Sequence, residues 1–278
     1  MKNKSLVGFL SLLLTCSCAE KKKKEIVNSD KGTVTVSETD HISASGKIFK
    51  LSESHPKGES LSNLKIETKG FETEFNVTLS DIDPIKKVFF ADLDENGFEE
   101  LYVTTQAAGS GAYSSIYGFA SNGDKSVSGI YAPQISEADM AEEGLFAGFM
   151  GKDDFLMQNN VLMRQFYQFK EGDTANKPTG DKVTIAYTLN AGEASWNLQA
   201  KPTFLAEGTL VKNCLGAFLA TEKGNLQICN KEIEAISAFL DGALLNITYV
   251  DVPACIIKEE AICGMAFPTT GTIKAVIL

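Results

Sequence analysis

Residues 87–120 read KVFFADLDENGFEELYVTTQAAGSGAYSSIYGFA. Three apolar or alternating runs lie within this stretch, at Lys87–Phe90, Leu101–Thr105 and Ile116–Ala120. The runs are rich in β-branched and aromatic residues, and an acidic segment and a glycine-rich segment separate them, which is the pattern of consecutive β-strands. The stretch therefore predicts strand, loop, strand, loop, strand, and it points to an all-β fold.

The same pattern continues on both sides of this stretch, with a compositional break near Lys201-Pro202. We predict an antiparallel β-sandwich or barrel-like domain over residues 46–201, followed by a small β-barrel-like domain over residues 203–278. The further predicted strands are Lys47–Leu51, Leu64–Thr68, Phe71–Leu79, Val183–Leu189, Trp196–Ala200, Phe204–Lys212, Ala217–Thr221, Leu226–Cys229, Leu244–Val250 and Thr272–Ile277.

Charge and composition exclude several functions. The chain of 278 residues has a formal net charge of -10 and a pI near 4.9, which argues against nucleic acid as a partner because phosphate binding needs a basic surface. Its two histidines, His41 and His55, both lie near the N-terminus. The adjacent acids Glu99 and Glu100 would point to opposite faces of a strand, so they cannot flank one bond as a catalytic pair. We therefore predict a protein that is not an enzyme.

The N-terminal segment has the layout of an export signal. Two early lysines precede the apolar run Leu6–Leu14, which is too short to span a bilayer. Because cysteines follow directly, residues 1–18 resemble a bacterial lipoprotein signal peptide, in which a cysteine is acylated. Cys18, preceded by the small Ser17, is the favoured lipidation site and Cys16 the alternative; a secreted protein with two unrelated cysteines is the other interpretation.

This signal predicts a lipid-anchored protein of the cell envelope, on the periplasmic face of the outer membrane or at the cell surface, which touches the membrane through its anchor only. Residues 19–45 are polar and contain few large apolar side chains. Such a segment buries too little surface to offset its ordering entropy, so we predict a flexible tether there.

The remaining four cysteines all lie in the second predicted domain, at Cys214, Cys229, Cys255 and Cys263. In an exported domain they are disulfide candidates, and three full pairings are possible. The local pairing joins Cys214 to Cys229 and Cys255 to Cys263. A zinc site is the alternative, although no Cys-x-x-Cys spacing occurs and no histidine lies nearby.

An acidic segment, Asp92–Glu100, separates the first two strands of the opening stretch. Oxygen-bearing side chains at alternate positions followed by glycine suit a hard cation such as Ca²⁺, with Asp92, Asp94, Asn96 and Glu100 as candidate ligands. The loop is not an EF-hand, because an EF-hand needs glutamate at its twelfth position and Val103 stands there. A solvated acidic hairpin is the alternative. Calcium is thus the one structural ion that the sequence suggests, and no cofactor is required.

A second loop, Ala108–Ser114, follows the strand Leu101–Thr105 and reads AGSGAYS. Two glycines favour a sharp turn, and Tyr113 at its tip offers a large flat side chain with a polar end, the type that anchors interfaces. A glycine-rich hairpin whose tyrosine packs on its own domain is the alternative.

The ordered series of these motifs resembles the bacterial periplasmic inhibitors of I-type (invertebrate) lysozyme, the PliI family, over residues 45–201. Asp92-Leu93-Asp94 with Asn96-Gly97 is followed by a strand and then by Ser110-Gly111-x-Tyr113. The other matching pieces, in order, are Gly118-Phe119-Ala120, Lys125-Ser126, Ile130-Tyr131, Gly148-Phe149-Met150-Gly151, Asp154-Phe155, Arg164-Gln165-Phe166, Glu171-Gly172-Asp173, Asn176, Pro178-Thr179-Gly180 and Gly192-Glu193-Ala194.

The resemblance implies that the Ser-Gly-x-Tyr loop enters the active-site cleft of a lysozyme, with Ser110, Gly111 and Tyr113 as the binding residues. The acidity clusters at Asp92–Glu100, close in sequence to this loop, and an acidic inhibitor is steered towards a basic enzyme. A non-inhibitory binding or scaffold lipoprotein of the envelope, stabilised by calcium, is the alternative. The second domain resembles small β domains of unassigned role. A homodimer is possible, and the sequence does not determine the oligomeric state.

Overall fold

A computed structural model describes residues 20–29, 32–174, 177–193, 195–213, 216–229, 241–252 and 271–276. The predicted signal peptide with Cys16 and Cys18 lies outside these residues. Within them the all-β prediction is confirmed, and the helical content is the short helix α1 (Glu137–Met140), capped at its N-terminus by the Ser136 side chain.

The described residues contain no helix with the length and apolar character needed to cross a membrane.

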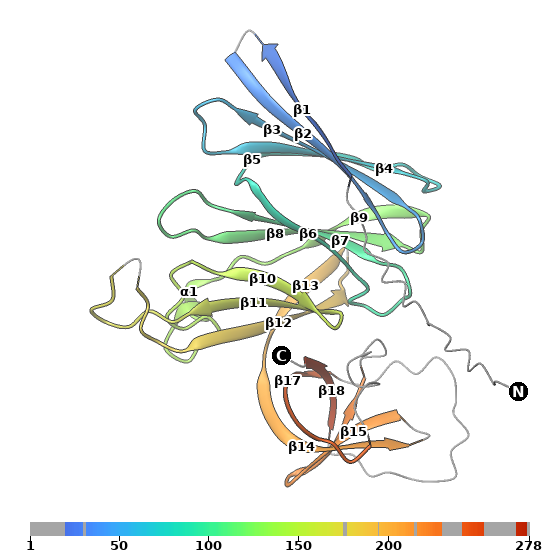
Figure 1. Ribbon diagram of the computed structural model, residues 1–278, viewed down its shortest axis with the longest axis vertical. Helices are drawn as coiled ribbons and strands as arrows, with labels where there is room; N and C mark the ends of the chain where they lie inside the picture. The colour runs from blue at the N-terminus through green and yellow to red at the C-terminus, as the bar shows by residue number, and fades with distance from the viewer. Residues whose placement is uncertain are drawn as a thin grey trace, which may run out of the picture.

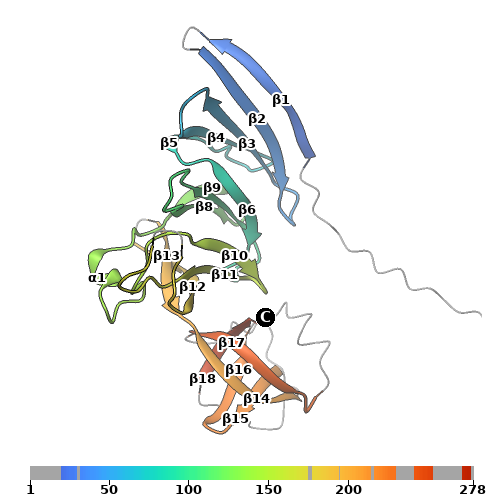
Figure 2. The same ribbon diagram turned by 60° about the vertical axis from the view of Figure 1, so that its left-hand side comes forward.

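The first layer is an antiparallel five-stranded sheet whose strands follow the order of the chain. In β4 every second side chain is buried, as expected for a strand with one face on a core and the other towards water. Figures 1 and 2 show this sheet in blue at one end of the molecule. Its strands are β1 (Glu20–Ser29), β2 (Gly32–Ile42), β3 (Ile48–Pro56), β4 (Ser62–Lys69) and β5 (Asn76–Ile82).

Within residues 19–45, predicted as a flexible tether, most of the described residues instead form the strands β1 and β2. β2 pairs with β3 without interruption, from Val34 opposite Pro56 to Ile42 opposite Ile48. Low hydrophobicity argues against order for an isolated segment, but here the neighbouring strand satisfies the backbone groups. The error came from judging the segment alone, without a partner strand.

The second layer is an eight-stranded sheet in the order β10-β11-β12-β13-β9-β8-β7-β6. All its pairs are antiparallel except β13 with β9, which run parallel and join the two halves of the sheet. Its strands are β6 (Ile85–Ala91), β7 (Glu100–Gln106), β8 (Ser114–Asn122), β9 (Ser126–Tyr131), β10 (Asp154–Gln158), β11 (Val161–Tyr167), β12 (Lys182–Ala191) and β13 (Trp196–Pro202).

Strand β7 is the central element, because the residues from Glu100 to Thr105 are buried on both of its faces. Leu101 and Val103 face the core shared with the five-stranded sheet, where they join Phe49 and Ile66. Tyr102 faces the other way, into the core that the curved eight-stranded sheet encloses. A strand buried on both sides is strongly restrained, so loops at its two ends start from fixed positions.

The third layer is a closed barrel in the order β14-β15-β16-β18-β17, drawn in orange to red in Figures 1 and 2. It begins one residue after β13, and Val250 of β17 is buried together with Val161, Met163 and Ala186 of the eight-stranded sheet. The barrel is therefore packed on the sheet as well as linked to it. Its strands are β14 (Phe204–Asn213), β15 (Gly216–Thr221), β16 (Gly224–Ile228), β17 (Leu244–Val252) and β18 (Gly271–Val276).

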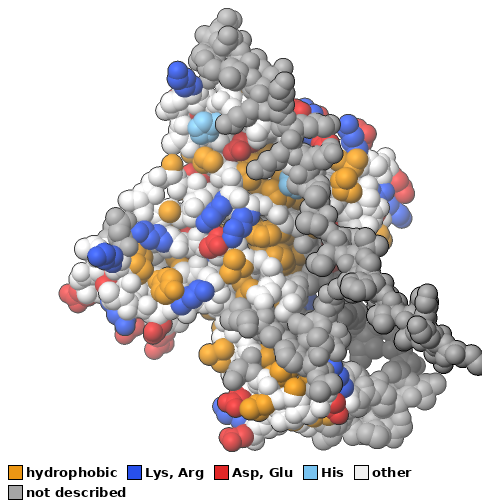
Figure 3. All heavy atoms as spheres, viewed as in Figure 1, with side chains coloured by type: hydrophobic (Ala, Val, Ile, Leu, Met, Phe, Trp, Pro, Cys, Tyr) orange, Lys and Arg blue, Asp and Glu red, His pale blue; other side chains and the backbone are white. Residues whose placement is uncertain are grey.

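Charged side chains of both signs are interspersed on the face drawn in Figure 3, and no broad basic area covers the described part of this face. Lys86 and Lys87, for example, both pair with Asp154, at 3.0 and 2.7 Å. Exposed pairs of this kind stabilise a fold by about 1 kcal/mol or less. The acidic loop before β7 belongs to the candidate site.

Candidate functional site

The two loops that the sequence singles out lie at opposite ends of β7. The acidic loop precedes Glu100, and the Ser-Gly-x-Tyr loop follows Gln106. Seven residues of extended chain separate the two loops by about 20 Å. They are neighbours in sequence but not in space, so the acidic loop does not adjoin the predicted lysozyme contact.

Backbone hydrogen bonds close the Ser-Gly-x-Tyr loop into a tight turn. Ala107 N donates to Tyr113 O at 2.8 Å across its base, and Ala112 N donates to Gly109 O at 2.9 Å at its tip. Lys152 N, from the segment that enters β10, donates to Gly111 O at 2.7 Å. The loop is therefore held from within and from a neighbouring segment.

A buried ion pair fixes the base of this loop. The Asp153 carboxylate accepts hydrogen bonds from Ser114 N at 3.0 Å and from Arg164 Nε at 2.7 Å. The Arg164 guanidinium also donates to Ser114 O at 3.0 Å. Both side chains are buried, with 0% of Asp153 and 9% of Arg164 exposed, so the pair is screened little by water.

Three aromatic rings surround the same guanidinium and link it to the loop. The Arg164 Cζ atom lies 4.8 to 5.6 Å from the ring centres of Phe146, Phe149 and Phe155. Phe149 in turn meets the Tyr113 ring edge-on at 5.6 Å. Tyr113 thus rests with one side on the core while 47% of it stays exposed.

Two glycines make this close approach possible. A Cβ at Gly151, whose φ is +84°, would lie 2.1 Å from Gly111 O. A Cβ at Gly111 would lie 2.5 Å from Cε2 of Tyr113. Because both distances are far below van der Waals contact, side chains at these positions would displace the loop or its tyrosine.

The predicted binding residues are thus brought to one exposed tip. Ser110 is exposed, Gly111 is half-buried beneath the tyrosine ring, and Tyr113 combines an anchored side with a free one. Tyr113 packs on its own domain and still presents about half its surface, so its role as an interface anchor stays a prediction. Sequence reasoning missed Asp153 and quoted Gly151 only as part of a matching piece, because the role of each depends on a contact with a loop distant along the chain.

At the other end of β7, three of the four predicted cation ligands meet. One carboxylate oxygen each of Asp92, Asp94 and Glu100 lies within 4.8 Å of the other two. Asn96 does not join them: its Oδ1 accepts from Phe98 N at 2.7 Å, and its Nδ2 donates to Asp94 at 2.8 Å. The asparagine orders the turn instead of extending the carboxylate cluster.

Burial, together with the proximity of these acids, raises the pKa values of two of them. Burial raises the pKa of Glu100 to about 9, although the Leu93 N–H opposes this, and the charges of Asp94 and Asp92 raise it further. Burial, together with the neighbouring Asp92, likewise raises the pKa of Asp94 to about 6. A site that holds negative charge this poorly by itself is suited to a positive ligand.

Of the four disulfide candidates, the structure describes Cys229. Cys229 is 5% exposed and disulfide-bonded, so its sulfur is not free to act as a zinc thiolate. The candidates Cys214, Cys255 and Cys263 lie outside the described residues.

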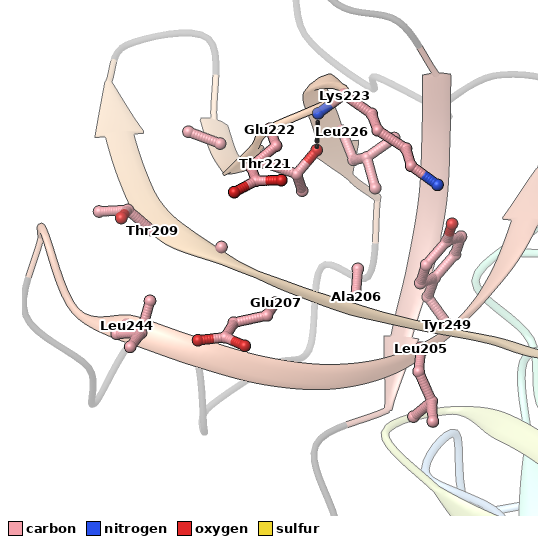
Figure 4. A pocket seen from close by; sticks show the side chains of 12 residues that line it. Leu205, Ala206, Glu207, Thr209, Thr221, Glu222, Lys223, Leu226, Leu244 and Tyr249 are labelled. Carbon is pink, nitrogen blue, oxygen red and sulfur yellow. Dashed lines mark hydrogen bonds between the residues drawn. The ribbon is translucent and has the colours of Figure 1, made fainter.

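The barrel carries a cleft of about 690 Å³ beside β14 and β17. Figure 4 shows Glu207 and Glu222 on its wall, with Lys223 extending on the side of Tyr249 in this view. Across the described residues, the acids at Asp92, Asp94 and Glu100 are the one group of three metal-ligating side chains, so this cleft holds no such centre. Its lining shows no arrangement that specifies a ligand.

Comparison with known proteins adds no relative: no family model, no curated protein and no solved structure matches the chain.

Proposed function

We propose that the protein is an exported, lipid-anchored inhibitor of lysozyme, with the I-type enzymes as its first target. Its Ser110–Tyr113 loop enters the active-site cleft of the enzyme, while the inhibitor itself performs no chemistry. The proposal rests on the resemblance of residues 45–201 to the PliI family, and one structural observation supports it most. An exposed serine and a half-exposed tyrosine stand on a turn that a buried ion pair holds in place.

A rigid loop suits this task because a binding segment that is already ordered loses little entropy on association. The hydrogen bonds of Gly111 and Ser114 to the segment before β10 restrain the tip in the free protein. Tyr113 supplies a large contact area at low rotamer cost, as tyrosines do in tight protein interfaces.

The chemistry of a lysozyme cleft matches the two side chains. Such a cleft holds a pair of carboxyl groups and walls that bind sugar rings. The Ser110 hydroxyl can donate a hydrogen bond to a catalytic carboxylate, and the flat ring of Tyr113 can occupy the place of a sugar. The net charge of -10 also favours encounter with a basic enzyme, although the acidic loop itself lies at the far end of β7.

The anchor is part of the proposal and rests on the sequence. If Cys18 is acylated, Ala19 is the single residue between the lipid and Glu20, where β1 begins. The five-stranded sheet would then lie close to the membrane surface, without the long spacer that a flexible segment over residues 19–45 would supply.

An inhibition titration tests the proposal. The full chain is titrated against I-type, chicken-type and goose-type lysozymes in a cell-wall turbidity assay, beside the Ser110→Ala/Tyr113→Ala double variant. Loss of an interface anchor costs about 2 kcal/mol or more, so we expect the double variant to inhibit at least thirtyfold more weakly. Tyr131→Ala is the matched control, because it removes an even more exposed tyrosine (60%) that lies outside the loop, in β9.

Failure to inhibit any lysozyme class would overturn the proposal and favour a non-inhibitory envelope lipoprotein. Equal inhibition by the wild type and the double variant would show that the contact lies away from this loop.

A further inference from the structure

We propose that Asp92, Asp94 and Glu100 bind a calcium ion at the end of β7 opposite the Ser-Gly-x-Tyr loop. This site is independent of lysozyme inhibition. Its role is to stabilise the turn between β6 and β7, at the point where the C-terminal barrel contacts the eight-stranded sheet.

The first support is the arrangement of the oxygens. Calcium binds oxygen ligands at about 2.3–2.6 Å, so two ligands on opposite sides of the ion lie about 5 Å apart. The three carboxylate oxygens lie within 4.8 Å of one another, close enough for one ion to touch all three. Magnesium demands near-ideal octahedral geometry and usually binds through one or two carboxylates, so a set of three carboxylates favours calcium.

The second support is independent of the clustering and concerns buried oxygens without partners. Glu100 is 0% exposed, and its Oε2 accepts a hydrogen bond from Leu93 N at 2.8 Å. Among the described residues, no donor reaches Glu100 Oε1 or Asp92 Oδ1, and both atoms are buried. An unpartnered buried carboxylate oxygen is costly, and a bound cation would compensate for this cost.

The third support is the distribution of cations around the loop. Lys274 of β18, in the barrel, pairs with Glu95 at 2.8 Å and donates to Leu93 O at 3.3 Å. The ion pairs formed within the described part of the chain include none to Asp92, Asp94 or Glu100. Glu95 is thus neutralised by lysine, while the three inward-facing acids are left for a different cation.

Hydrogen bonds within the chain also order this loop. Gly97 N donates to Asp92 Oδ2 at 2.9 Å, and Asn96 N donates to Asp94 Oδ1 at 3.1 Å. Asn160, in the turn between β10 and β11, accepts from Asp92 N at 3.0 Å and donates to Asp92 O. These contacts leave the unpartnered oxygens turned inward, so little reorganisation opposes binding.

The experiment is a calcium titration of the full chain after EDTA treatment, by calorimetry and thermal unfolding. At a calcium concentration about a hundredfold above Kd, we expect the Tm to rise by about 5 °C or more. Asp94→Asn and Glu100→Gln should each weaken calcium binding at least tenfold. In EDTA these two variants should unfold at the wild-type Tm or higher. Asp94→Asn removes a charge that neighbouring acids repel, and Glu100→Gln replaces a buried side chain, whose raised pKa of about 9 keeps it uncharged near neutral pH, with one of the same shape.

Glu99→Gln is the matched control. It removes one acidic charge from the same loop, but Glu99 accepts a hydrogen bond from Ala44 N and does not join the cluster. We expect it to change calcium affinity less than threefold. The site is supported if Glu99→Gln keeps its calcium affinity while Asp94→Asn and Glu100→Gln lose theirs.

Two results would overturn the proposal. The first is no binding heat and no rise in Tm up to about 10 mM calcium, tenfold above the weakest Kd typical of extracellular calcium modules. The second is an equal effect of magnesium and calcium, since the proposed geometry favours the larger ion.

Discussion

Replacing Asp153 with alanine perturbs the ion pair that holds the base of the Ser-Gly-x-Tyr loop. The substitution removes the acceptor of Arg164 Nε at 2.7 Å and of Ser114 N at 3.0 Å. Breaking a buried pair by removing one partner costs about 3–5 kcal/mol, because the other charge stays buried without compensation. The side chains are 0% and 9% exposed, so solvent screening reduces this figure little.

The expected loss is measured by urea and thermal unfolding followed through Trp196, the one tryptophan of the chain. This residue lies in β13 of the eight-stranded sheet, so its fluorescence reports on the layer that contains the pair. A loss of about 3–5 kcal/mol lowers the Tm by roughly 6–20 °C in a domain of this size.

Adding Arg164→Met to the Asp153→Ala variant provides the control. The double change removes the unpaired guanidinium and keeps a long side chain against the three phenylalanine rings, so it should recover part of the lost stability. The reasoning is refuted if Asp153→Ala costs less than about 1 kcal/mol. It is also refuted if the double variant is no more stable than the single one.

Three further changes test other parts of the structure. Gly151→Ala should weaken lysozyme inhibition at least tenfold while the barrel stays folded, because its Cβ would meet Gly111 O at 2.1 Å; unchanged inhibition would contradict the proposed loop geometry. Val250→Ala should cost about 1–3 kcal/mol and release the barrel faster in limited proteolysis, since Val250 is 2% exposed where the barrel meets the sheet; an unaltered digestion rate would exclude a packed junction. Hydrogen bonds from the backbone of Lys170 and then of Thr179 lower the pKa of Asp173 below its usual value of 3.8. The Asp173 carboxylate therefore stabilises the fold fully above pH 3.8, and this stabilisation is lost as the pH falls through the folded-state pKa. The Tm difference between wild type and Asp173→Asn should therefore shrink towards pH 2, and a constant difference from pH 7 to pH 2 would contradict this assignment.

Short runs of β-branched and aromatic residues between turn signals were enough to predict the strands around β7 and the all-β class. Such a run is a local property, and Leu101–Thr105 has its β-branched and aromatic residues regardless of which strands lie on either side. The same criterion failed for residues 19–45. There the side chains are polar, and the strand β2 exists because β3 offers it a hydrogen-bonded edge.

The cation ligands show the same division. The spacing of Asp92, Asp94 and Glu100 identified three acids that the turn before β7 does bring together. Asn96 was predicted beside them, yet its amide is used by Phe98 N and Asp94. Which lone pairs remain available depends on the backbone of the turn, and residue spacing alone does not contain that information.

What the sequence determined by itself was local: strand periodicity, glycine-bearing turns, and the residue types at the tip of the Ser110–Tyr113 loop. The tertiary structure decided everything that requires distant segments to meet. It placed Asp153 and Arg164 beneath the loop, Lys274 of the barrel beside Glu95, and the two loops of interest about 20 Å apart on one strand. The physical reason is that backbone patterning acts over a few residues, whereas burial, which gives an ion pair or an unpartnered oxygen its energetic weight, exists only once the layers have packed.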